Sequence, residues 1–153
     1  MTTLLLNLVG VSVFVGSLAM VWTANARRWN RLALPYCDDR PPIDSTLRQM
    51  QSLVLVGGGI AFNSYKGIVT VGISSDGISL RLFAPFSVFH PPLLIPYQDI
   101  QVEPTSWYLN CSSFRYSFAA VDDVEMIVDD TLKDWIDREV GRLASGTLAS
   151  SPS

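Results

Sequence analysis

Hydrophobic and polar positions divide the chain into three parts with different periodicities. Residues 4–24 are apolar in almost every position, residues 47–128 alternate in several short runs, and residues 132–143 repeat at helical spacing. A long apolar run is typical of a membrane-spanning helix. Alternation with a period of two is typical of strands, and a period near 3.6 is typical of an amphipathic helix. The pattern predicts a mainly β chain with one helix at each end.

The first apolar run, Leu4 to Ala24, contains 21 residues and no charged side chain. About 20 apolar residues span the hydrocarbon core of a bilayer as a helix. A cleavable signal peptide carries its positive charge before a shorter core, whereas here the arginines follow the run. We therefore expect a transmembrane helix over 4–24. Cleavage at Ala24-Asn25-Ala26 and a buried helix of a soluble domain are the alternatives.

Basic residues behind the apolar run predict the orientation of the chain. Positive charge next to a transmembrane helix tends to stay in the cytoplasm. We expect a single-pass protein of the inner (plasma) membrane, with its N-terminus outside and its C-terminal domain cytoplasmic. The residues expected at the membrane interface are Trp22, Arg27, Arg28, Trp29 and Arg31.

Residues 25–46 are interpreted as a juxtamembrane linker, because three prolines and three aspartates occur within residues 32–46. Short alternating runs follow and predict strands. One face holds Ile78, Leu80 and Leu82, and Asp76-Gly77 in front of them is a hairpin signal. The other expected strands lie within 47–56, 60–74, 93–96, 100–104, 107–118 (two strands with a turn near 110–113) and 124–128.

The last periodic segment predicts a helix that starts after Asp129 or Asp130, since an aspartate can cap the first turn. Its apolar face consists of Leu132, Trp135, Ile136, Val140 and Leu143. Such a face can close the open end of a small barrel. Residues 144–153 are rich in small polar side chains and are expected to form a disordered tail.

Charge and cysteine content narrow the class of partner. The formal net charge is −3, which argues against nucleic-acid binding because that needs a basic face.

Cys37 and Cys111 are far apart and form no CxxC motif. They are expected to be two reduced thiols in a cytoplasmic domain, and a disulfide in an oxidising compartment is the alternative.

The segment VFHPPLLIPYQDI, residues 88–100, holds the only histidine of the chain. A metal site needs three or four converging ligands, and a serine hydrolase of the common type needs a G-x-S-x-G elbow; neither accompanies His90. The glycines at 57–59 lack the lysine and helix of a phosphate loop, and the acidic cluster at 122–130 lacks the EF-hand pattern. We expect no catalytic residue, no cofactor and no metal.

Three aromatic side chains, Phe83, Phe86 and Phe89, precede the histidine in an expected loop between strands. Exposed together, they would form an apolar patch that contacts a partner or the bilayer. The alternative is that the three rings fill one end of the barrel.

Two motifs carry a resemblance to known proteins. Gly77, Ile78 and Leu80, followed by Ile95, Pro96, Asp99 and Ile100, resemble a GRAM-type, pleckstrin-homology-like (PH-like) domain. Trp29, Leu32, Ala33 and Tyr36, followed by His90 to Leu93, resemble a group of uncharacterised bacterial single-pass membrane proteins. The likeness implies a PH-like small antiparallel barrel of about seven strands with a C-terminal amphipathic helix, over residues 47–143.

The resemblance implies a fold and no particular chemistry, since such folds host many functions. Phosphoinositide-binding PH domains are similar in carrying several basic residues around the first hairpin, whereas only Arg48 and Lys66 occur here. A specific phosphoinositide is therefore not expected. We expect a non-catalytic interaction or scaffold module whose partner is another protein. The alternative is a lipid-sensing module that uses Arg27, Arg28, Arg31 and the Phe83–Phe89 loop.

Overall fold

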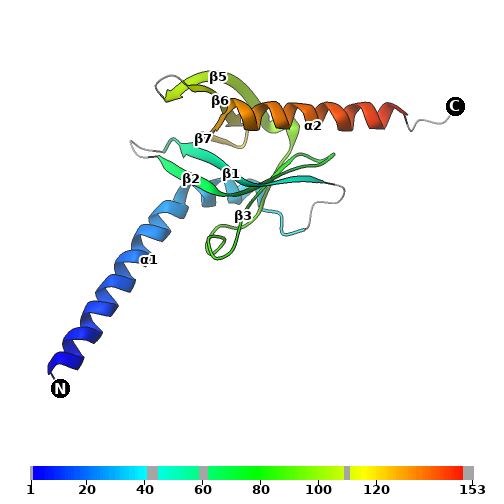
Figure 1. Ribbon diagram of the computed structural model, residues 1–153. Coiled ribbons are helices and arrows are strands. Elements are labelled where there is room, and N and C mark those ends of the chain that lie inside the picture. Colours follow the sequence, from blue (N-terminus) through cyan, green and yellow to red (C-terminus); the bar gives the residue numbers. More distant parts are fainter. Residues whose placement is uncertain (1, 41–44, 59–61, 109–110, 150–153) are drawn as a thin grey trace.

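The computed structural model describes residues 2–40, 45–58, 62–108 and 111–149. A long helix, α1 (Thr2–Tyr36), leads into seven strands, and a second helix, α2 (Asp130–Ala149), ends the chain (Figure 1). The strands are β1 (Thr46–Val56), β2 (Asn63–Ile73), β3 (Ile78–Leu82), β4 (Leu93–Ile95), β5 (Ile100–Tyr108), β6 (Cys111–Phe118) and β7 (Val121–Asp129). A short 3-10 helix, η1 (Tyr97–Asp99), connects β4 to β5.

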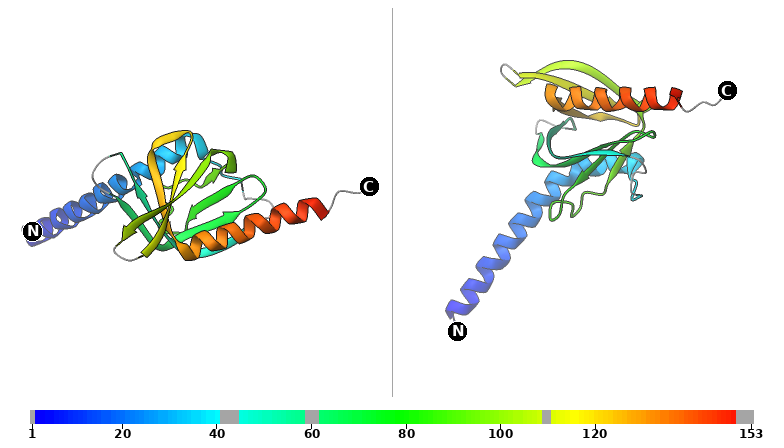
Figure 2. Two further views of the ribbon diagram at one scale, coloured as in Figure 1. Left: turned by 90° about the horizontal axis from the view of Figure 1, so that it is seen from above. Right: turned by 45° about the vertical axis from the view of Figure 1, so that its right-hand side comes forward.

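The seven strands form one antiparallel sheet in the order β4-β3-β2-β1-β7-β6-β5. The sheet curls into a half-barrel (Figure 2), with β4 and β5 as its two edges. The expected mainly β fold with seven antiparallel strands and a C-terminal helix is confirmed. The short runs expected at 100–104 and at the start of 107–118 belong to one strand, β5. Pro104 is accommodated there because an edge strand has one side without ladder partners.

Alternation along the strands explains the core. Val69, Val71 and Ile73 of β2 are buried, and so are Ile78, Leu80 and Leu82 of β3, as the period of two predicts. Gly77 ends the hairpin between these strands, where Ser74 N–H donates to the Gly77 carbonyl at 3.1 Å. The hairpin thereby directs both apolar faces into the half-barrel.

Helix α2 packs against the sheet with its predicted apolar face. Leu132 and Ile136 are buried, and Trp135, Val140 and Leu143 pack partly buried beside them. The Asp129 carboxylate caps the helix, accepting from Leu132 N–H at 2.7 Å. The helix runs on to Ala149, beyond the expected start of a tail at residue 144, because alanine and leucine in this stretch favour helix.

Helix α1 differs from expectation in its C-terminal part, where a linker over 25–46 was expected. The helix continues to Tyr36, and Trp29, Leu32 and Tyr36 are buried in the core of the half-barrel. Together with Ala26, these residues recur at spacings of three and four, so an apolar stripe lies along this end of the helix. No helix in the described part of the chain is both long enough and apolar enough to cross a membrane.

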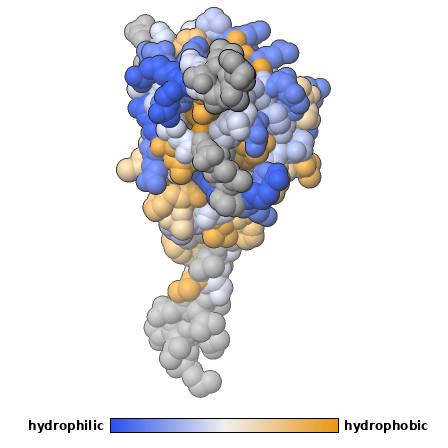
Figure 3. All heavy atoms as spheres, turned by 90° about the vertical axis from the view of Figure 1, so that its right-hand side faces the viewer, coloured by the Kyte–Doolittle hydropathy of each residue, from blue (hydrophilic) through white to orange (hydrophobic). Residues whose placement is uncertain are grey.

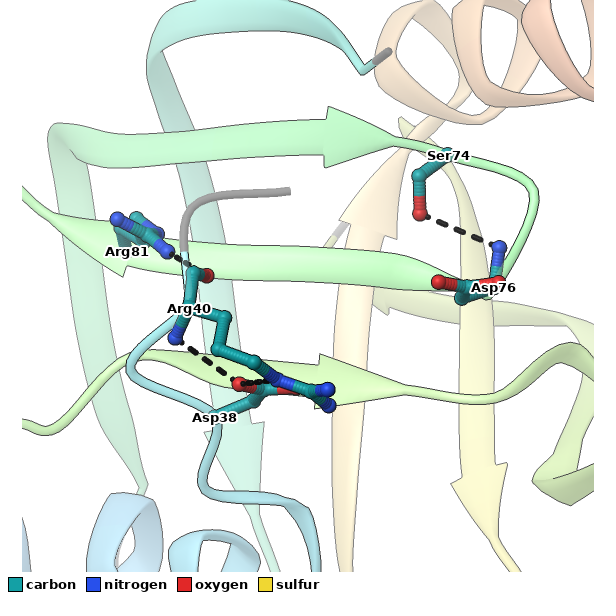
Figure 4. Close-up of polar contacts among 5 residues, drawn as sticks. All are labelled: Asp38, Arg40, Ser74, Asp76 and Arg81. Atoms are coloured by element: carbon teal, nitrogen blue, oxygen red, sulfur yellow. Dashed lines mark hydrogen bonds and ion pairs between the residues drawn. The ribbon is translucent and has the colours of Figure 1, made fainter. Parts of the chain in front are cut away.

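The chain after α1 is fastened to the edge of the sheet. Cys37 bridges to Leu93 of β4, and Asp38 N–H donates to the Pro92 carbonyl at 3.1 Å. Figure 4 shows how Arg40 extends this attachment: its guanidinium pairs with Asp38 at 2.7 Å, while its carbonyl accepts from Arg81 at 2.6 Å. Residues 37–40 therefore belong to the folded domain.

Candidate functional site

The segment with the single histidine forms an aromatic cluster with α1. The rings of Trp29 and His90 lie 5.7 Å apart, and Tyr65 of β2 lies 5.4 Å from Trp29 and 5.7 Å from His90. The Trp29 indole N–H donates to the Pro91 carbonyl at 2.7 Å. All three side chains are almost completely buried. The cluster joins α1, β2 and the loop before β4.

His90 has a structural role in this cluster. Its Nδ1 lies 3.0 Å from the Val88 carbonyl and its Nε2 lies 3.4 Å from the Tyr65 hydroxyl. Burial lowers the pKa of His90, because an imidazolium would lose its hydration there. The same burial raises the pKa of Tyr65, so the phenol stays neutral. Among the described residues, no three His, Cys, Asp or Glu side chains gather as a metal site would require.

The expected membrane-interface residues occupy three different environments. Arg27 is exposed. Arg28 donates to the Gly57 carbonyl at 2.6 Å and to Asn63 Oδ1 at 2.7 Å, and Arg31 pairs with Asp123. Both of these arginines therefore hold α1 to the β1–β2 and β6–β7 ends of the sheet.

The structure places Trp29 in the core instead of at a membrane interface. The indole is completely buried, because it lies on the apolar stripe of α1 that faces the half-barrel. The side chain of Trp22 lies outside the described part of the chain. The Cys37 thiol is free and exposed, and the side chain of Cys111 also lies outside the described part.

The loop between β3 and β4 exposes two of its three phenylalanines. Phe83 is 58% exposed and Phe89 is 60% exposed, whereas Phe86 packs against the core. The rings of Phe83 and Phe86 lie 5.8 Å apart. Val88, directly before Phe89, is 53% exposed. The loop therefore keeps one ring as an internal support and presents an apolar tip to its surroundings.

A groove of about 390 Å³ lies between α2 and the concave face of the sheet. Its walls are mostly apolar. They are formed by Ile78, Tyr97, Ile100, Val102, Tyr116, Ile136, Asp137, Val140 and Gly141. The sequence patterns did not single out this groove, because its residues come from five elements that meet only in the folded chain.

Two tyrosines and one carboxylate give the groove its polar character. Tyr97 donates its hydroxyl to the Ser74 carbonyl at 2.7 Å, which fixes the ring as part of the wall. Burial, and secondarily the charge of Asp137, raise the pKa of Tyr116. Asp137 is itself paired with Lys133 one helical turn away. A neutral phenol and a paired carboxylate suit binding of a neutral, largely apolar segment.

Comparison of the chain with protein-family models, with curated proteins and with solved structures found no match. What the protein does is therefore inferred from its own residues. Two surfaces stand out in the described part of the chain: the groove beside α2, and the exposed tip of the loop that contains Phe83, Val88 and Phe89. The sequence indicated Phe83 and Phe89 of the second surface but not Val88, and it missed the groove.

Proposed function

We propose that this chain is a non-catalytic, membrane-anchored interaction module with a PH-like domain, which binds an extended segment of a partner protein at the cytoplasmic membrane face. The antiparallel half-barrel with a C-terminal helix supports the PH-like part of the proposal. The uncharged run Leu4 to Ala24 supports the anchor, because its length suits a bilayer core. The arginines behind it support the cytoplasmic side.

The observation that carries the binding function is the groove beside an open sheet edge. Within the described residues, strand β5 pairs with β6 alone, so its outer backbone edge can accept a further strand. Ile100 and Val102, two residues apart on β5, both line the groove. A partner segment along β5 would place alternate apolar side chains beside them, while main-chain hydrogen bonds would extend the sheet.

Gly141 offers a sharp test of this proposal. It lies in α2 and lines the groove, and a Cβ added to it would meet no atom within 4 Å. Gly146, also helical in α2 and equally open, does not line the groove. Gly141→Phe should fill the groove without disturbing the helix, whereas Gly146→Phe should leave the groove open.

The experiment is photocrosslinking in native membranes from a benzophenone side chain at Val102, followed by mass spectrometry. We expect a discrete crosslinked partner whose yield Gly141→Phe reduces at least several-fold, while Gly146→Phe leaves it unchanged. Equal yields in the two variants would refute binding in the groove. Alkaline carbonate extraction of the same membranes tests the anchor, since an integral protein stays in the pellet. A reporter fused after Ser153 that is active only outside the cytoplasm would refute the orientation.

A second candidate function is lipid sensing, and one observation favours part of it: the exposed apolar tip of the β3–β4 loop. The arginine part has less support, because Arg28 donates to groups within the domain and Arg31, although exposed, pairs with Asp123. An exposed apolar loop beside arginines that are largely engaged within the domain favours insertion over recognition of a charged head group.

A further inference from the structure

We propose that the tip of the β3–β4 loop, formed by Phe83, Val88 and Phe89, is a second membrane contact that enters the bilayer interface beside α1. The partner is the interfacial layer of the lipid bilayer itself, and no particular head group is required. The inference rests on the proposed membrane anchor and deepens it. The loop would give the domain a second point of contact with the membrane, and two points of contact would fix the orientation of the domain relative to the bilayer.

The loop has the composition of an interfacial segment. Three large apolar side chains are each more than half exposed within seven residues, whereas exposed apolar side chains on soluble domains usually occur singly. From Leu82 to Gln98 the sequence contains no Asp, Glu, Lys or Arg, and its one histidine is buried. Nothing charged at this tip would have to lose its hydration on entering the interface.

The loop is also tied to the helix that leads toward the proposed anchor. The Trp29 indole N–H donates a hydrogen bond to the Pro91 carbonyl, and the Asp38 N–H donates one to the carbonyl of the next residue, Pro92. Trp29 follows Ala24 by five residues, a rise of about 7.5 Å along a helix. The loop is therefore fastened to α1 just behind the uncharged run. An interfacial segment typically lies about 5–10 Å into the boundary between head groups and acyl chains.

The arrangement in space agrees with this role. Figure 1 shows the β3–β4 loop on the side of the domain from which α1 departs, while the β5–β6 hairpin lies on the far side. The second view of Figure 2 keeps the loop beside α1. In Figure 3, hydrophobic residues gather at the base of the domain around the emerging helix, and hydrophilic residues dominate higher up. The apolar end of the domain thus faces the proposed membrane.

Internal bonds hold the loop in this shape before any contact is made. Phe83 N–H donates to the Ile68 carbonyl at 3.1 Å, and Phe86 N–H donates to the Phe83 carbonyl at 2.9 Å. His90 N–H closes the loop by donating to the Ser87 carbonyl at 2.9 Å. Because the tip is preorganised, insertion requires little further ordering of the backbone.

The first test uses the unmodified full chain in vesicles of zwitterionic phospholipid doped with a photoactivatable phospholipid. We expect lipid adducts on residues 83–89 after illumination, at a yield several-fold above that of Ser112, which is exposed on the β5–β6 hairpin. Adducts confined to residues 4–24 would refute the loop contact and leave the anchor standing. A chain that does not remain with the vesicles after carbonate washing would refute the anchor.

A second measurement separates lipid from protein as the occupant. An environment-sensitive dye is attached to Val88→Cys or to Ser112→Cys, in a chain with Cys37→Ser and Cys111→Ser. A nitroxide-bearing lipid should quench the dye at position 88 several-fold more strongly than the dye at position 112. Equal quenching would overturn the proposal. A dye at 88 that is shielded from water but not quenched by the lipid would indicate contact with another protein, which also overturns it.

Discussion

The indole N–H of Trp29 donates a hydrogen bond of 2.7 Å to the carbonyl of Pro91, 62 residues away in the sequence. This bond joins the C-terminal part of α1 to the loop that precedes β4. The tryptophan is completely buried and Pro91 is partly exposed, so the bond is partly shielded from water. The C-terminal part of α1 is therefore part of the domain, and a shift of the helix would also move the β3–β4 loop.

We expect Trp29→Ala to lower the free energy of unfolding of the domain by about 3–5 kcal/mol, the usual cost of removing a buried aromatic side chain. Trp29→Phe keeps much of the ring contact and leaves the Pro91 carbonyl without its indole donor, so we expect a loss of about 1–3 kcal/mol. The measurement is urea denaturation of the full chain in detergent, followed by tryptophan fluorescence and circular dichroism.

Leu34 provides the matched control on the same helix, because it is 88% exposed. Leu34→Ala should change the free energy of unfolding by no more than about 0.5 kcal/mol. If Trp29→Ala were as mild as Leu34→Ala, α1 would not belong to the cooperative unit of the domain.

Local periodicity was sufficient to predict most of the strands and α2, although it divided β5 into two runs and gave no order for the strands. Val69 and Val71 on one side of β2, and Leu132 and Ile136 on one side of α2, are apolar because they face the same core. In each of these elements, the spacing of the apolar residues within a short stretch of sequence indicates which side chains are buried. The same holds for the cap of α2, which the sequence assigned to Asp129 or Asp130 and which the Asp129 carboxylate provides.

Contacts between distant segments could not be predicted in this way. The prolines after His90 suggested a loop, but the sequence gives no sign that Pro91 accepts from Trp29. The stripe containing Trp29 and Tyr36 was hidden because the arginines between its members suggested a membrane border. The groove escaped detection for the same reason: Val102 of β5 and Gly141 of α2 line the same groove only because α2 packs against the sheet.

Acidification should weaken the cluster around His90. Burial lowers the pKa of His90 below its ordinary value of 6.5, so the unfolded chain takes up a proton before the folded chain does. The stability that a neutral His90 contributes is full above pH 6.5 and is lost as the pH falls below that value. The hydrogen bond between His90 and the Val88 carbonyl raises the pKa, but this effect is smaller than that of burial.

The measurement is the urea midpoint of the full chain at pH 7.5 and at pH 5.5. We expect a lower midpoint at pH 5.5, and a smaller difference between the two values in His90→Phe, which cannot take up the proton. An unchanged difference in that variant would assign the acid sensitivity to other groups.

The pairing of Asp38 with Arg40 should persist far into acid. Hydrogen bonds from the Arg40 side chain, and then from its backbone N–H, lower the pKa of Asp38 to about 2. A carboxylate with a lowered pKa supports the fold above its ordinary value of 3.8, and this support is lost as the pH falls toward 2. Carbon NMR titration of Asp38 should give this low pKa, and Arg40→Gln should raise it toward 3.8. An unaltered pKa in the variant would contradict the pairing.

Alanine substitutions at two glycines with positive φ allow the cost of backbone strain to be distinguished from the cost of steric overlap. Gly57 has φ +98° and Gly67 has φ +66°, so alanine is strained at both. A Cβ at Gly57 would also overlap the Asp123 carbonyl, whereas a Cβ at Gly67 would meet nothing within 4 Å. We therefore expect Gly67→Ala to cost about 1–2 kcal/mol of unfolding free energy. Gly57→Ala should cost about 3 kcal/mol or more, since the strand beside it must also shift. Urea denaturation of both variants measures the difference, and equal costs would show that the approach of Gly57 to β7 is not close.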